Sequence, residues 1–120
     1  MPVTNTFSAP VTYAPAVIGA VTQSTNRSTA VTINSAVGVI TTDVTVIGTG
    51  ATASFIVNNS FVTASSKILA TVVASGSALT AVQIPALTIS TIGAGVFTIN
   101  VASVGSGNLA GITILFQVLS

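Results

Sequence analysis

Only three side chains in this 120-residue chain carry a formal charge: Arg27, Asp43 and Lys67. The chain has no His and no Cys, so it lacks the commonest general base and any thiolate nucleophile. Asp43 is the only carboxylate side chain, so neither a pair of catalytic carboxylates nor a cluster of acidic metal ligands can form. The sequence therefore predicts a protein that is not an enzyme and that holds no metal ion or other cofactor.

Ser66 and Lys67 are the one pair that suggests a serine nucleophile with a lysine base. Adjacent side chains on a strand point to opposite faces, so the pair is a poor dyad in an extended segment. We therefore give the three charges structural interpretations. Lys67 is expected to open a strand and protect a sheet edge. Asp43 is expected to face solvent, or else to pair with Arg27 or Lys67 within the chain or across a subunit boundary. Arg27 is either an exposed loop residue or a donor to backbone carbonyls or to a carboxylate.

The scarcity of charge also limits the partners. Charged residues make up 2% of the chain, against about a quarter of an average domain. A net charge of +1 provides no basic surface for nucleic acid or for an anionic membrane, so neither partner is expected. Molecules with so little charge repel one another weakly, and we expect this protein to function inside an assembly.

From residue 16 onward the chain has the composition and alternation of β-strands. Val, Ile, Thr and Phe dominate, and Gly, Ser and Asn clusters separate the runs. About eight strands are expected near residues 16–22, 29–34, 37–47, 51–58, 67–75, 79–91, 94–103 and 110–119. Short strands at this spacing are typical of an all-β antiparallel sandwich, with jelly-roll or Greek-key wiring, over residues 16–120.

The alternation also assigns side chains to faces. The residues expected to face the core are Val31, Ile33, Val44, Val46, Phe55, Val57, Phe97, Ile99, Val101, Ile112, Ile114, Phe116 and Val118. In the last strand Thr113, Leu115 and Gln117 are expected on the opposite face, and the exposed apolar positions of this strand are candidates for contact with a partner.

Residues 1–15 contain Pro2, Pro10 and Pro15, which fix φ and remove backbone donors. This segment is expected to form an extended arm rather than part of the sandwich. Its two aromatic residues, Phe7 and Tyr13, favour contact with a neighbouring subunit over a frayed terminus, since a free tail gains little from aromatic rings.

Several segments occur in an order that is informative. Residues 21–34 (VTQSTNRSTAVTIN) are followed by GVIT at 38–41, ATASFIVNNS at 51–60, GVFTINV at 95–101 and a final strand ending in Phe116-Gln117-Val118. Over roughly residues 20–119 this order resembles a group of small bacteriophage virion proteins found in phages of cyanobacteria and other bacteria. The chain is less charged than many of them around residues 67–73, and the resemblance does not extend to the arm.

The resemblance implies a structural virion protein with an antiparallel β fold that assembles as a homotrimer. Our first hypothesis is a capsid decoration or cement protein, located on the capsid surface, with the major capsid protein as its partner. The candidate interaction residues are Phe7, Tyr13, Arg27, Asp43 and Lys67. The alternative is a tail or fibre adhesin module that recognises a host surface, although the chain is poor in the aromatic and acidic residues that glycan sites use. A Thr-rich ice-binding surface is a third possibility, but the Thr residues lack a regular repeat.

Overall fold

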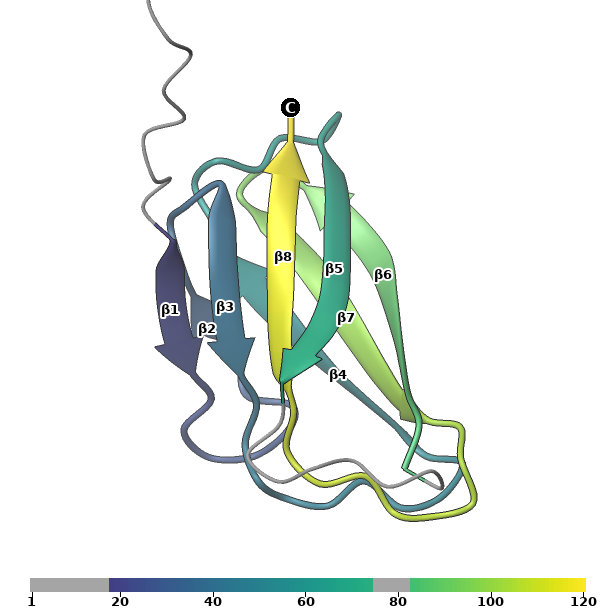
Figure 1. Ribbon diagram of the computed structural model, residues 1–120. Coiled ribbons are helices and arrows are strands. Elements are labelled where there is room, and N and C mark those ends of the chain that lie inside the picture. The colour runs from purple at the N-terminus through teal and green to yellow at the C-terminus, as the bar shows by residue number, and fades with distance from the viewer. Residues whose placement is uncertain (1–17, 75–82) are drawn as a thin grey trace, which may run out of the picture.

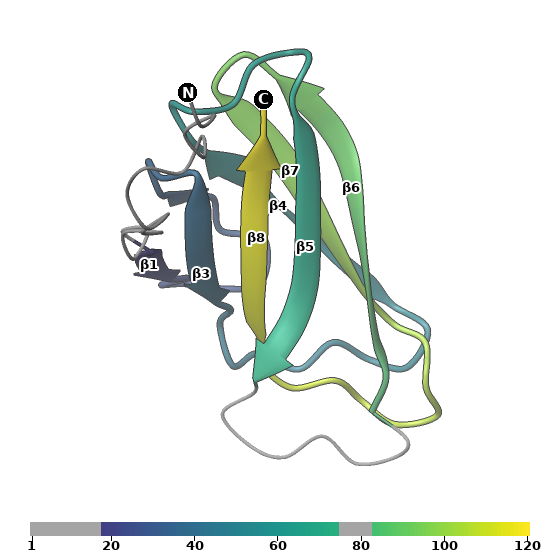
Figure 2. The same ribbon diagram turned by 45° about the horizontal axis from the view of Figure 1, so that its top comes forward.

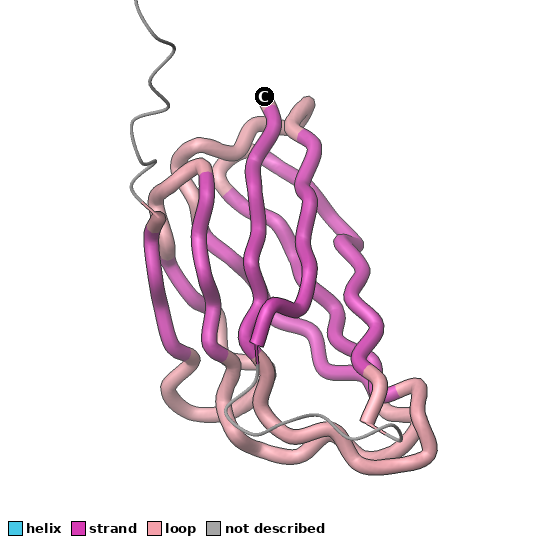
Figure 3. Tube along the Cα trace, in the orientation of Figure 1, coloured by secondary structure: helices cyan, strands magenta, loops and turns pink. Residues whose placement is uncertain are grey.

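Two four-stranded sheets pack face to face in the computed structural model, which describes residues 18–74 and 83–120 (Figure 1). The strands are β1 (Gly19–Thr22), β2 (Val31–Thr32), β3 (Val37–Thr41), β4 (Thr52–Asn58), β5 (Lys67–Ala74), β6 (Pro85–Gly93), β7 (Val96–Ser103) and β8 (Thr113–Leu119). All described residues lie in strands or in the loops between them (Figure 3). The expected all-β sandwich of eight strands is confirmed.

Each sheet combines parallel and antiparallel pairs. Sheet A has the order β1-β3-β8-β5, and sheet B has the order β2-β4-β7-β6. The pairs β1–β3 and β2–β4 are parallel, and the other strand pairs are antiparallel. The expectation of a wholly antiparallel sandwich was therefore wrong. Between β1 and β3 the chain passes through sheet B, so β3 returns beside β1 in the same direction, and β2 and β4 are related in the same way through sheet A.

The two sheets lie at an angle to each other, with β4 and β7 running diagonally behind β8 (Figures 1 and 2). The core between them consists of side chains from alternate strand positions, as expected for stacked sheets. Phe97 of β7 and Phe116 of β8 meet at its centre in an edge-to-face contact, with ring centroids 5.4 Å apart. Of the expected core residues the structure buries Val31, Ile33, Phe55, Val57, Phe97, Ile99, Val101, Ile112, Ile114, Phe116 and Val118.

Val44 and Val46 are the exceptions, with 80% and 53% of their surfaces exposed. The strand expected over residues 37–47 ends at Thr41. The Asp43 carboxylate then accepts the backbone N–H of Thr45 at 2.8 Å, a local turn in which Asp replaces a backbone acceptor. The chain therefore leaves the sheet, and only Ile47 returns to pair with Leu109 in an isolated bridge.

Gly38 is placed opposite Phe116 in the register of β3 and β8. A Cβ added at Gly38 would lie 2.5 Å from Cδ1 of Ile33 and 2.6 Å from Cε1 of Phe116. The missing side chain therefore provides the space into which the Phe116 ring packs. Gly48, by contrast, lies in a loop where an added Cβ would meet nothing within 4 Å.

We predict that Gly38→Ala lowers the free energy of unfolding by about 2 kcal/mol, because a well-packed core must shift to admit the methyl group. Gly48→Ala is the matched control and should change stability by less than about 0.5 kcal/mol. Urea unfolding of the two variants beside the wild type measures both values. Equal stability of the Gly38 variant and the wild type would show that Gly38 does not make room for Phe116.

Candidate interaction surface

The outer face of sheet A carries a group of apolar side chains. Strand alternation turns Ile40, Ile114, Phe116 and Val118 into the core, and their neighbours point away from it. We call the outward apolar group the sheet-A face; its residues are Val37, Val39, Leu69, Leu115 and Leu119. Leu69 and Leu119 are 57% and 42% exposed, and the other three are half-buried.

The strand register brings these side chains into rows across β3, β8 and β5. Gln117 of β8 is paired with Val37 of β3 on one side and with Leu69 of β5 on the other. The next row places Leu115 between Val39 and Thr71. Directly opposed side chains on one face of a sheet lie close enough to touch, so the rows form one continuous surface.

A shallow apolar hollow of about 280 Å³ lies on this face. Val37, Leu69, Thr71, Leu115 and Gln117 contribute to its lining. A hollow with apolar walls and an amide at one side suits an apolar side chain or strand of another protein, and it offers no group that could do chemistry.

The outer face of sheet B is different in kind. Ser54 donates to Oδ1 of Asn100 at 2.6 Å, and the Asn100 amide donates to the Thr88 hydroxyl at 3.3 Å. Thr91 donates to Thr98 at 2.8 Å on the same sheet. These bonds join β4, β7 and β6 through hydroxyl and amide groups that water also solvates well. Ile56, 47% exposed, is a large apolar side chain on this face.

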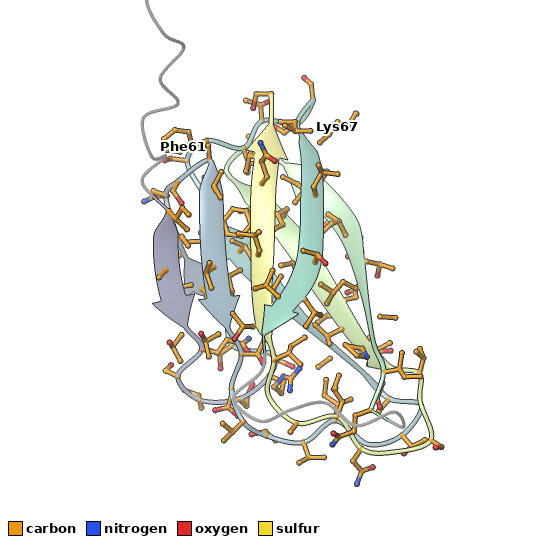
Figure 4. All side chains as sticks on the ribbon, in the orientation of Figure 1. Phe61 and Lys67 are labelled. Atoms are coloured by element: carbon orange, nitrogen blue, oxygen red, sulfur yellow. The ribbon has the colours of Figure 1, made fainter. Side chains whose placement is uncertain are left out.

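Lys67 is the first residue of β5, which is an edge strand of sheet A, so its expected position is confirmed. It is exposed and pairs in register with Leu119, which places a charge at the margin of the sheet-A face. A lysine on an edge strand discourages pairing with a strand of another molecule. Lys67 and Phe61, which is 52% exposed, lie at the same end of the sandwich, where β8 ends (Figure 4).

Arg27 is buried in the loop between β1 and β2, so its interpretation as an ordinary exposed loop residue was wrong. Its Nη1 donates to the backbone carbonyls of Ala110 at 3.0 Å and Thr45 at 3.2 Å, which confirms the expected bonding to carbonyls. Burial lowers the pKa of Arg27 from its usual value, and the nearby Asp43 partly offsets this.

Asp43 lies in the loop after β3 rather than in a strand, and it is partly exposed. Its carboxylate accepts from the Thr45 hydroxyl and from the Thr45 N–H. The hydroxyl bond is the main reason that the pKa of Asp43 lies below its usual value. The carboxylate of Asp43 is thus hydrogen-bonded within the turn that Asp43 itself begins.

Of the three candidate residues that the structure describes, Arg27 and Asp43 lie near each other and Lys67 lies apart from them. Phe7 and Tyr13 lie outside the described residues. Lys67 is on β5, whereas Arg27 and Asp43 are on loops that follow β1 and β3. Leu69 and Val37 were not among the predicted residues, although alternation from Lys67 along residues 67–73 (KILATVV) places Leu69 on the same face as Lys67.

Comparison of the chain with protein-family models, with curated protein sequences and with solved structures finds no match. Over the described ranges, 18–74 and 83–120, no helix is long and apolar enough to cross a membrane. The fold and the surface therefore provide the grounds on which a function can be proposed.

We predict that Leu69→Lys makes the purified protein more soluble, because it replaces the most exposed apolar side chain of the sheet-A face with a charged one. Ile56→Lys is the matched control, since it adds the same charge at a similarly exposed site on sheet B. Static light scattering against protein concentration measures association. The prediction fails if both variants associate as the wild type does, or if Ile56→Lys reduces association as strongly.

Proposed function

We propose that this chain is a bacteriophage virion protein that decorates the capsid and cements it, binding the major capsid protein at junctions between capsomers. The observation that carries the proposal is the sheet-A face, an apolar surface that residues 18–74 and 83–120 leave exposed. Contiguous apolar surface on a soluble protein marks a site of association. The order of the sequence segments, which resembles that of small phage virion proteins, supports a capsid as the place where that association occurs.

The near absence of charge favours a structural role. Each ion that an interface buries carries a desolvation penalty of several kcal/mol unless it is well paired. The sheet-A face contains no charged residue, and Lys67 lies at its margin. The protein can therefore cover this face against a partner without removing a charge from water. Cores of protein interfaces are depleted in charged residues for the same reason.

The kinds of side chain that are exposed favour the decoration role over the adhesin role. Glycan-binding sites commonly stack sugars on aromatic rings, and among the described residues Phe61 is the one exposed aromatic side chain. The hollow on sheet A is lined by aliphatic side chains, Thr71, Gln117 and Phe116, with no carboxylate. The Phe116 ring is buried in the core, with 1% of its surface exposed, so it offers no open face on which a sugar could stack. This lining suits an aliphatic protein surface better than a sugar.

The wiring of the sandwich supports a jelly-roll-like classification. In a jelly roll, eight strands are divided between two sheets, and the chain crosses repeatedly from one to the other. Here every consecutive pair of strands changes sheet except β6 and β7. The parallel pairs β1–β3 and β2–β4 distinguish it from an all-antiparallel jelly roll.

We predict that the purified protein is a closed homotrimer with three times the 11.8 kDa mass of the chain. Closed symmetric oligomers match the local threefold positions of a capsid. Sedimentation equilibrium gives the mass directly. A monomer at every concentration tested would remove the trimer from the proposal.

We predict that phage particles lacking this protein lose DNA at a lower temperature than complete particles. Adding back the wild type or Ile56→Lys should restore heat resistance, whereas Leu69→Lys should not, because its charge would be buried against the capsid. Release of DNA on heating, followed with an intercalating dye, is the measurement. Equal heat resistance with and without the protein would contradict the cement function.

A further inference from the structure

Arg27 is held in place by a buried glutamine. Gln23, 3% exposed, donates from its amide to the carbonyl of Thr29 at 2.9 Å and to that of Arg27 itself at 3.2 Å. Its side-chain oxygen accepts the N–H of Asp43 at 3.0 Å. One side chain thus joins the loop after β1 to the loop after β3 and fixes the backbone from which Arg27 extends.

The guanidinium of Arg27 is buried without a carboxylate partner. The residue is 5% exposed, and Nη1 donates to the carbonyls of Thr45 and Ala110. Nη2 is buried and has no hydrogen-bond partner among the described residues. A buried donor without an acceptor is unfavourable, and more so when the group is charged.

Asp43 does not satisfy this guanidinium. The two groups are close enough for Asp43 to raise the pKa of Arg27, but the Asp43 carboxylate is bonded to Thr45. Burial lowers the pKa of Arg27 more than the charge of Asp43 raises it. Asp43 therefore compensates only in part for the burial of the guanidinium. A second side-chain carboxylate would have to come from another molecule, because Asp43 is the sequence's only acidic side chain.

Arg27 forms part of the wall of a pocket of about 410 Å³. Ser28 and Thr45 add polar groups to the wall, and Val46 and Ala51 add apolar ones. Val46 and Ala51 belong to loops exposed to solvent. Because Nη2 is buried, a ligand atom can reach it only if part of the pocket wall is displaced.

We propose that this pocket is a carboxylate-binding site, in which Arg27 receives a carboxylate carried on a short apolar stem by a partner protein. Nη2 supplies the unused charged donor, and Ser28 lies in the same wall, whereas the Thr45 hydroxyl already donates to Asp43. A hydrogen bond between ions is stronger than one between neutral groups, and a partly desolvated site strengthens it further. The pocket is separate from the sheet-A face, and the proposal does not depend on a role in a capsid.

The test is an NMR titration of the full-length protein with sodium propionate, a carboxylate on a short apolar stem. Propionamide, which keeps the carbonyl and lacks the charge, is titrated in parallel, as is sodium chloride at the same ionic strength. Saturable shifts of the Arg27 side-chain resonances and of the pocket amides are expected with propionate. Propionamide should bind more than about tenfold more weakly.

Three variants locate the site. Ala51→Leu narrows the pocket and leaves the bonds of Arg27 to Thr45 and Ala110 in place, and it should weaken propionate binding more than about tenfold. Arg27→Gln, provided that it folds, should also weaken propionate binding more than about tenfold. Lys67→Gln removes the other positive side chain, at the opposite end of the sandwich from the end of β1, and should leave the affinity within about twofold (Figures 1 and 4).

Several outcomes would overturn the proposal. One is the absence of saturable shifts with propionate. Another is an equal response to chloride, which would indicate an adventitious ion only. Equal binding of propionamide would show a site for neutral carbonyls. Unchanged affinity in Ala51→Leu would place any carboxylate site elsewhere.

Discussion

The contact between Phe97 and Phe116 is the interaction on which the rest of the structure depends. Each ring comes from a strand inside its sheet, and both are fully buried. Edge-to-face packing adds about 1 kcal/mol to the burial of the two rings. Its larger effect is on register, since a slip of one residue would exchange the two faces of a strand. With Phe116 held in the core, Leu115 and Gln117 must face outward on sheet A, and with Phe97 held there, Thr98 must face outward on sheet B. The sheet-A face is thus a consequence of how the core is locked.

A chain with three charged side chains must rely mainly on uncharged polar groups to hydrate its surface. On sheet B, hydroxyl and amide groups bond to one another across the strands and remain compatible with solvent. Sheet A presents aliphatic side chains instead. The one arginine, Arg27, is buried and donates hydrogen bonds to backbone carbonyls of two loops. This difference between the sheets supports the proposal that the sheet-A face contacts another molecule, although Ile56 and Val96 are also exposed on sheet B. An average domain, with about a quarter of its residues charged, would not need such a division.

Much of the fold follows from local pattern. The period of two in residues such as 96–101 and 112–118 is sufficient to identify strands and their buried side, because every core strand must place alternate residues inward. The direction in which strands pair is not encoded in that period, so the parallel pairs β1–β3 and β2–β4 were missed. Residues 43–46 were predicted to be part of a strand because apolar and polar residues alternate there. In the structure they form a turn instead, which the Asp43 carboxylate stabilises by accepting the Thr45 N–H. The burial of Arg27 could not be predicted, since it depends on Ala110, a residue distant in sequence. The sheet-A face could not be predicted from any single segment, because it depends on the register of three strands.

The proposal that the sheet-A face binds a capsid can be tested by electron cryomicroscopy of phage particles that contain this protein. We expect density for the sandwich on the outside of the head, at junctions between capsomers, with β3, β5 and β8 turned toward the major capsid protein. Density for the sandwich only on the tail, or on the head with sheet B against the capsid and sheet A open to solvent, would contradict it.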